Sequence, residues 1–148
     1  MAALRIATLL LSLGGAALAD EAPVYAVEGN AIPAPLTAVP GDPARGPGIV
    51  RAANVTCLIC HHMPIPEEPD QGAIGPDLAG VGSRMTQGEL RLRLVNPKLL
   101  NPDTLMPAYY ETRGLYRVDT PYQGRTIYSA QDIEDVVAWL SSLRETGE

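Results

Sequence analysis

Phenylalanine is absent from the 148-residue sequence, tryptophan occurs once, and aromatic residues make up only 5%, although hydrophobic residues reach 46%. Phenylalanine is a main filler of small cores because its side chain buries a large apolar area. Glycine and proline occur 14 times each, well above their average combined usage of roughly 12%. We therefore expect one loop-rich domain with a thin core of leucine, valine, isoleucine and alanine, which a further component has to complete.

Three other shortages exclude whole classes of protein. The 11 basic residues against 17 acidic ones argue against nucleic-acid binding, which requires a basic surface. No apolar stretch reaches the length of about 18 residues that a membrane-spanning helix needs. Two cysteines are too few for a fold held together by many disulfides.

Residues 1–19 have the three parts of an export signal. Arg5 gives a positive start, an apolar run covers residues 6–17, and Ala17-Leu18-Ala19 fits the small-x-small cleavage pattern. The alternatives are a buried N-terminal helix and a membrane anchor, but a run of about a dozen residues is short for an anchor. The pattern predicts a removed signal peptide and a mature chain that begins near Asp20, in a bacterial periplasm or outside the cell.

The stretch over residues 20–41 contains four prolines and shows neither a helical nor a strand period. We interpret it as an extended arm that lies on the domain or on a partner, with a disordered tail as the alternative. Residues 42–148 form the predicted domain. Its first helix begins either after a cap at Asp42-Pro43 or at Gly46-Pro47, and both starts are compatible with the sequence.

Two further helices carry clear start signals. Thr86 and Glu89 form a capping box, and the helix that they open has to stop near Asn96 because the next residue is proline. Ser129 caps the strongest pattern, a helix over roughly residues 130–144. Its apolar stripe, with Trp139 at the edge, consists of Ile133, Val136, Val137, Leu140 and Leu143. The glycine- and proline-rich stretches between these helices, 61–83 and 97–128, are expected to be loops, so the predicted fold is all-α, with three or more short helices and long loops.

Cys57-Leu58-Ile59-Cys60-His61 is a C-x-x-C-H motif, the attachment signature of c-type haem. Two thiols three positions apart can reach the two vinyl groups on one edge of the macrocycle, and the adjoining imidazole then lies beneath the iron as proximal ligand. Covalent attachment would hold the cofactor even in a small fold with few aromatic residues. The motif predicts one covalently bound haem c, attached at Cys57 and Cys60, with His61 on the iron.

A C-x-x-C pair has three other interpretations. The cysteines could form a structural disulfide, which is common in exported proteins. They could be a thioredoxin-like redox pair, although the βαβ pattern expected around such a pair is missing. They could bind zinc, although no second pair of ligands follows at the usual spacing. The adjoining histidine and the export signal favour haem, and His62 is interpreted as a surface residue because its neighbour is fixed beneath the iron.

The sixth iron ligand in electron carriers is often a methionine thioether, which favours the reduced state. The mature chain offers Met63, Met85 and Met106. Met63 is too close to His61 along the chain to reach the opposite face of the ring, and Met85 is explained more simply by packing in the core. Met106, followed by Pro107 in an irregular loop, is the predicted ligand, with ordinary packing of a loop methionine as the alternative.

Several motifs resemble class I cytochromes c. They are Gly75-Pro76-Asp77-Leu78 after the haem motif, then Gly80-Val81-Gly82-Ser83-Arg84, and finally Met106-Pro107. The resemblance implies a class I cytochrome c-like fold wrapped around one haem. It also implies that the Pro76 carbonyl accepts the N–H of the proximal histidine, and that Arg84 lies near a haem propionate.

A closer resemblance, to the SoxX family of small cytochrome subunits, covers nearly the whole mature chain. It rests on Pro35-Leu36-Thr37, on residues 41–46, on the haem motif with His62, on residues 75–78 and on residues 105–110. The resemblance implies a periplasmic, electron-accepting subunit of a SoxAX-type complex. In that complex a SoxA-like partner, where the substrate site is expected, couples thiosulfate oxidatively to a cysteine of a SoxY-type carrier protein. This L-cysteine S-thiosulfotransferase reaction releases electrons, which the chain would pass to a downstream cytochrome.

Two other functions remain as alternatives. The chain could be a free-standing periplasmic electron shuttle, or a haem-free thiol–disulfide oxidoreductase. In the SoxX-like interpretation the cysteines anchor haem and His61 and Met106 ligate iron, so no residue of this chain is expected to act on substrate as a catalyst.

Overall fold

The computed structural model describes residues 24–52 and 56–145. The predicted signal peptide over residues 1–19 and the predicted start of the mature chain at Asp20 lie outside these ranges. None of the helices in the described ranges combines the length and the hydropathy that a bilayer crossing requires.

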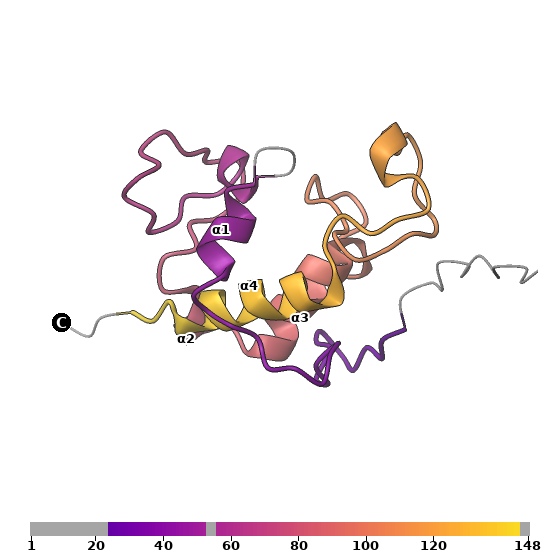
Figure 1. Cartoon of the computed structure of the whole chain (residues 1–148), viewed down its shortest axis with the longest axis horizontal. Helices are drawn as coiled ribbons and strands as arrows, with labels where there is room; N and C mark the ends of the chain where they lie inside the picture. Colours follow the sequence, from indigo (N-terminus) through magenta and orange to yellow (C-terminus); the bar gives the residue numbers. More distant parts are fainter. Residues whose placement is uncertain (1–23, 53–55, 146–148) are drawn as a thin grey trace, which may run out of the picture.

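One long helix, α4 (Ala130–Ser142), forms the centre of the fold, and the other three α-helices of the described part pack against it. These are α1 (Gly46–Val50), α2 (Val81–Arg84) and α3 (Gln87–Val95), and Figure 1 shows them around α4. Three single 3₁₀ turns, η1 (Cys57–Ile59), η2 (Pro97–Leu99) and η3 (Thr120–Tyr122), interrupt the long loops. Within the described residues the only β feature is an isolated bridge between Glu28 and Ala31. The predicted all-α fold is confirmed.

The starts of α3 and α4 are fixed by local hydrogen bonds, as their sequences predict. The Thr86 hydroxyl accepts the N–H of Glu89, and the Glu89 carboxylate accepts the Thr86 N–H in return. Ser129 and Asp132 form the same reciprocal pair at the start of α4. Two of the N–H groups that a helix start leaves unpaired are satisfied in each case. Both predicted starts are confirmed, and α4 ends two residues earlier than the predicted position 144.

The first helix begins at Gly46, the second of the two predicted starts. Asp42 still caps a preceding turn, because its carboxylate accepts the Ala44 N–H at 2.9 Å. A Cβ at position 46 would overlap the side chain of Trp139, so glycine allows α1 to approach α4 closely. Trp139 is therefore buried beneath α1, whereas its position in the helical pattern had placed it at the edge of the apolar stripe.

The prediction of a continuous loop over residues 61–83 is wrong at its C-terminal end, where α2 begins at Val81. The glycines at positions 80 and 82 suppress any helical signal in the sequence. The turn forms because tertiary contacts override this weak propensity: Val81 and Gly82 are buried, and the Gly82 N–H donates to the Leu143 carbonyl at 2.8 Å.

Within the segment 24–41, residues 30–41 lie along α3 and α4 of the same chain. Ile32 is buried and its N–H donates to the Gly88 carbonyl, while the Leu36 N–H donates to the Glu134 carboxylate on α4. The same carboxylate forms a two-pronged ion pair with Arg91 on α3, at 2.7 and 2.8 Å. Arg91 also donates to the Ile32 carbonyl, so one buried pair links the segment to both helices.

Neutralising Glu134 should destabilise the fold strongly. Glu134→Gln leaves the Arg91 guanidinium charged and buried without its counter-ion, since both side chains are almost inaccessible. Removing one partner of such a pair lowers the free energy of unfolding by about 3 kcal/mol, which denaturant unfolding of the purified protein measures. Glu67→Gln, at an exposed acidic residue, is the control, and an equal effect of the two substitutions would contradict the assignment.

Candidate cofactor site

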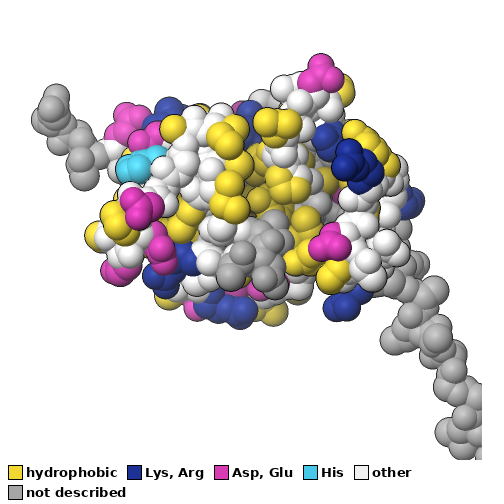
Figure 2. All heavy atoms as spheres, turned by 90° about the horizontal axis from the view of Figure 1, so that it is seen from above, with side chains coloured by type: hydrophobic (Ala, Val, Ile, Leu, Met, Phe, Trp, Pro, Cys, Tyr) yellow, Lys and Arg dark blue, Asp and Glu magenta, His cyan; other side chains and the backbone are white. Residues whose placement is uncertain are grey.

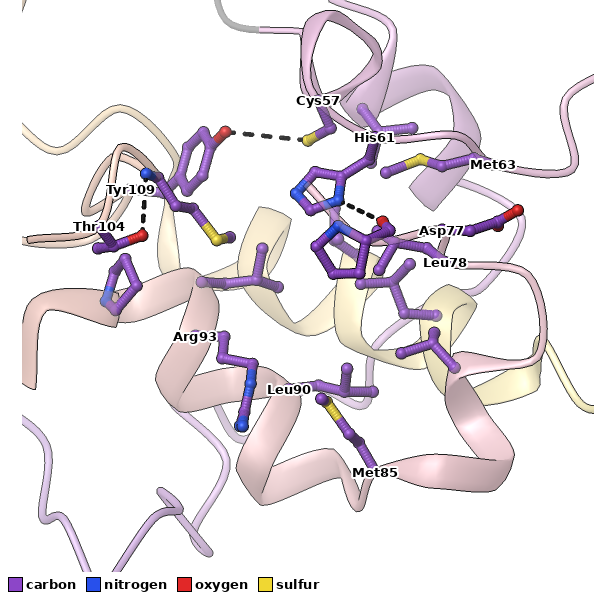
Figure 3. A pocket seen from close by; sticks show the side chains of 18 of the residues that line it. Cys57, His61, Met63, Asp77, Leu78, Met85, Leu90, Arg93, Thr104 and Tyr109 are labelled. Carbon is purple, nitrogen blue, oxygen red and sulfur yellow. Dashed lines mark hydrogen bonds between the residues drawn. The ribbon is translucent and has the colours of Figure 1, made fainter. Parts of the chain in front are cut away.

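The C-x-x-C-H motif lies on a single 3₁₀ turn, η1, that follows α1. The Thr56 hydroxyl caps this turn by accepting the Leu58 N–H and itself donates to the Val50 carbonyl at the end of α1. The His61 N–H donates to the Cys57 carbonyl at 2.9 Å, which continues the turn to the histidine. As a result Cys57 is buried, Cys60 is half-buried, and the imidazole of His61 points into a cleft beside Cys57 (Figure 3).

The His61 ring is oriented by a hydrogen bond between its Nδ1 and the carbonyl oxygen of Pro76, at 2.8 Å (Figure 3). A carbonyl only accepts, so Nδ1 carries the hydrogen and the lone pair of Nε2 is left for a metal. The loop is held against the motif because the Gly75 N–H donates to the Cys60 carbonyl at 2.7 Å. A Cβ on Gly75 would overlap the imidazole, so glycine is needed for this approach.

Gly75→Ala should therefore displace the His61 ring. The added methyl group overlaps three atoms of the imidazole, and the histidine has to rotate or the 72–77 loop has to move. We expect a lower thermal midpoint and an altered absorbance spectrum of the bound cofactor. Gly48→Ala, at a glycine whose Cβ would meet no neighbour, should change neither property, and equal behaviour of the two variants would contradict this geometry.

The cleft is a largely apolar hollow of about 370 Å³ that runs between the 57–78 loop and the 97–109 loop, over α3 and α4. A second hollow of about 380 Å³ adjoins it, because seven residues line both, Cys57, His61 and Met106 among them. Seen from above, hydrophobic side chains gather in the middle of this face (Figure 2). The two hollows together form one open apolar slot with sulfur and imidazole donors in its walls.

The three candidate methionines all line the first hollow. Met63 is buried on the His61 side of the motif, and Met85 lies at the far end near Leu90 (Figure 3). Only Met106 also lines the second hollow, the one that Cys60 lines. Met106 therefore borders the part of the slot that is closest to the whole motif.

Arg84 lines the cleft, and its guanidinium donates to the carbonyls of Asp77 and Ala79 at 3.0 and 2.8 Å. It therefore holds the loop that follows Pro76 in place.

Arg93 on α3 also lines the cleft (Figure 3), and its guanidinium donates a hydrogen bond to the Glu89 carbonyl. No sequence motif singles out Arg93, although its position three residues after the buried Leu90 places it on the same side of the helix.

A stacked tyrosine pair lies behind Cys57. The rings of Tyr109 and Tyr128 are 4.7 Å apart between centroids, and both hydroxyls lie 4.0 Å from the Cys57 sulfur. No sequence motif assigns either tyrosine to the site, because both come from loops far from the haem motif. Burial raises the pKa of the free Cys57 thiol, whereas a thiol–disulfide oxidoreductase needs a lowered one.

His62 points away from this cleft into solvent. Its side chain is 59% exposed and its Nδ1 lies 3.0 Å from the Asp77 carboxylate. The backbone N–H of Ala79 and the neighbouring His62 lower the pKa of Asp77, which keeps this exposed carboxyl ionised. Within the described residues, no group of three or more histidine, cysteine or acidic side chains is arranged so that it could bind a metal ion.

The sequence model of the family described as cytochrome c matches residues 44–144. The chain belongs to the cytochrome c family. A search of the solved structures finds the crystal structure of SoxXA from P. pantotrophus, with 35% sequence identity and a TM-score of 0.74. The match covers 82% of this chain and 95% of that chain, which agrees with the resemblance to SoxX. A search of curated proteins returned no match.

Membership of this family means that the chain carries covalently bound haem c. The slot fits this group by the chemistry of its donors: two cysteines on one wall, an imidazole with its Nδ1 hydrogen engaged, and thioethers among apolar side chains. A flat apolar macrocycle supplies the bulk that the sequence lacks in aromatic residues.

Proposed function

We propose that the chain is the electron-accepting cytochrome subunit of a SoxAX-type complex, located in the periplasm after removal of residues 1–19. The observation that carries the proposal is the hydrogen bond from His61 Nδ1 to the Pro76 carbonyl, in a slot that Met106 also lines. The similarity of the chain to SoxXA supports it. Cys57 and Cys60 are the covalent attachment points. His61 and Met106 would hold the haem iron.

Each of these residues has a defined task. The Pro76 carbonyl keeps His61 in one tautomer and makes its Nε2 a stronger donor. The Met106 thioether favours the reduced form, as expected for an electron acceptor. Haem supplies a centre that gains and loses one electron at a time. The apolar side chains of the cleft exclude water from it. Arg84 donates to two carbonyls and to the Glu145 carboxylate and keeps further N–H groups for a propionate.

The proposed reaction takes place on the partner and not on this chain. A SoxA-like subunit joins thiosulfate to the cysteine thiol of a SoxY-type carrier, which forms a sulfur–sulfur bond and releases a proton and a pair of electrons. With His61 and Met106 both holding the iron, the bound haem would leave no site for thiosulfate and would supply one-electron transfer to a downstream cytochrome. The outward residues of the segment 24–41 are proposed to face the partner, and the exposed Val39 gives this surface an apolar element.

The same haem site would also serve a free-standing electron shuttle, and a reduction experiment separates the two functions. The chain is purified from a periplasmic extract of thiosulfate-grown cells, alone and with whatever second cytochrome co-purifies. Thiosulfate and a SoxY-type carrier are then added while the haem absorbance is followed. The proposal predicts reduction of this haem only in the sample that contains the partner. Equal reduction without the partner, or the absence of any second cytochrome, would contradict the subunit role.

A further inference from the structure

The loop that carries Met106 lies between two hollows. On its outer side lies a separate hollow of about 450 Å³, lined by Met106, Pro107 and Ala108 on one wall and by Tyr116 and Tyr122 on the other. Leu105 is 84% exposed and therefore contributes little packing. Met106 itself packs only partly against the core, so with the cofactor slot on one side and this outer hollow on the other, hydrogen bonds have to help hold the loop in place.

Two hydrogen bonds meet at Thr104 in this loop. The Lys98 ammonium donates to the Thr104 carbonyl at 3.1 Å, and the Met106 N–H donates to the Thr104 hydroxyl at 3.2 Å (Figure 3 shows the second). Together these two hydrogen bonds link Lys98 through Thr104 to the backbone of Met106. Lys98 is the only lysine in the sequence.

Lys98 itself is held in place by the hydrogen-bonded backbone of η2. Lys98 lies on η2, directly after the buried Pro97, whose carbonyl accepts the N–H groups of Leu100 and Asn101. Asn101 in turn holds the following turn, because its side chain accepts the Asp103 N–H. The ammonium therefore connects a fixed point at the end of α3 to Thr104, two residues before Met106.

We infer that Lys98 is a positioning residue that keeps the Met106 thioether on the haem iron. The inference rests on the proposed function, in which Met106 is the sixth ligand. Lys98 does not touch the cofactor slot but restrains the loop from its outer side, where the hollow would otherwise give it room to move. A hydrogen bond from a charged donor is stronger than one between neutral groups, so its loss should free the loop measurably.

The test measures how fast cyanide replaces the sixth ligand of the oxidised, haem-loaded protein. Lys98→Met removes the ammonium and keeps the length of the side chain, so cyanide binding should become about fivefold faster. Lys98→Arg restores a charged donor and should stay within about twofold of the wild type. Arg125→Met removes the same charge from the wall of the same outer hollow, leaves the Lys98–Thr104 bond intact, and should have no effect.

The red sulfur-to-iron absorbance band and the thermal midpoint complete the test. In Lys98→Met the band should weaken while the thermal midpoint stays close to that of Arg125→Met, which separates a displaced loop from a destabilised fold. Equal cyanide rates in Lys98→Met and Arg125→Met would overturn the inference, as would a Lys98→Arg protein as fast as Lys98→Met. If the wild-type protein lacks the band, the assignment of Met106 as a ligand is wrong, and the role of Lys98 with it. If the wild-type band is normal and Lys98→Met has no effect, only the role of Lys98 is wrong.

Discussion

Replacing Cys57 and Cys60 together with alanine is expected to abolish covalent haem attachment and to leave a chain that does not reach its native fold. The slot beside these residues is a large apolar hollow in a domain whose core consists mainly of aliphatic side chains. Without its covalent cofactor that surface is exposed to water, and small domains have little stability to spare. Haem staining after denaturing electrophoresis measures attachment, and circular dichroism measures the remaining helix.

His62→Ala is the matched control for the double substitution. His62 adjoins the motif, but it is exposed and pairs with Asp77 on the surface, so its loss should leave haem staining and helix content unchanged. A double cysteine variant that folds like the wild type would contradict the claim that the cofactor completes the core. Covalent haem that survives the loss of both cysteines would contradict the attachment site itself.

Met106→Ala is expected to open the sixth position of the iron. The red sulfur-to-iron band of the oxidised protein should disappear, and the reduction potential should fall by on the order of 100 mV, within the range of about 0.8 V that axial ligands span. The fall follows because a thioether stabilises the reduced iron and water or hydroxide does not. Absorbance of the oxidised protein and a redox titration measure the two effects.

Met85→Leu is the control, since Met85 lines the same cleft near Leu90 and leucine conserves its apolar volume. It should retain the band and a potential close to that of the wild type. If the band survives in Met106→Ala and is lost in Met85→Leu, the ligand is Met85, and the assignment of the 105–107 loop is wrong.

Local signals in the sequence were sufficient for the helix starts and for the haem motif. The capping boxes at Thr86 and Ser129 act within four residues, so their hydrogen bonds can be predicted without knowing the rest of the fold. The C-x-x-C-H spacing is also local, and the resemblance to known cytochromes supplied the carbonyl of Pro76 as the partner of His61.

The contacts that the sequence did not predict join distant segments. Arg91 occurs on a helix where a charged residue is expected to face solvent, yet it is buried because Glu134 on α4 and the Ile32 carbonyl lie opposite it. The two tyrosines beside Cys57 come from loops that follow it by 52 and 71 residues along the chain. Such pairings depend on the tertiary fold and leave no periodic pattern in the sequence.

The most direct test of the proposed role is native mass spectrometry of the chain, recovered through a C-terminal tag from the periplasm of thiosulfate-grown cells. We expect a complex in which residues 20–148, bearing one covalent haem, are bound to a second c-type cytochrome. A haem-free chain would contradict the cofactor site, and a haem-bearing chain that is found only as a monomer would contradict its role as a subunit.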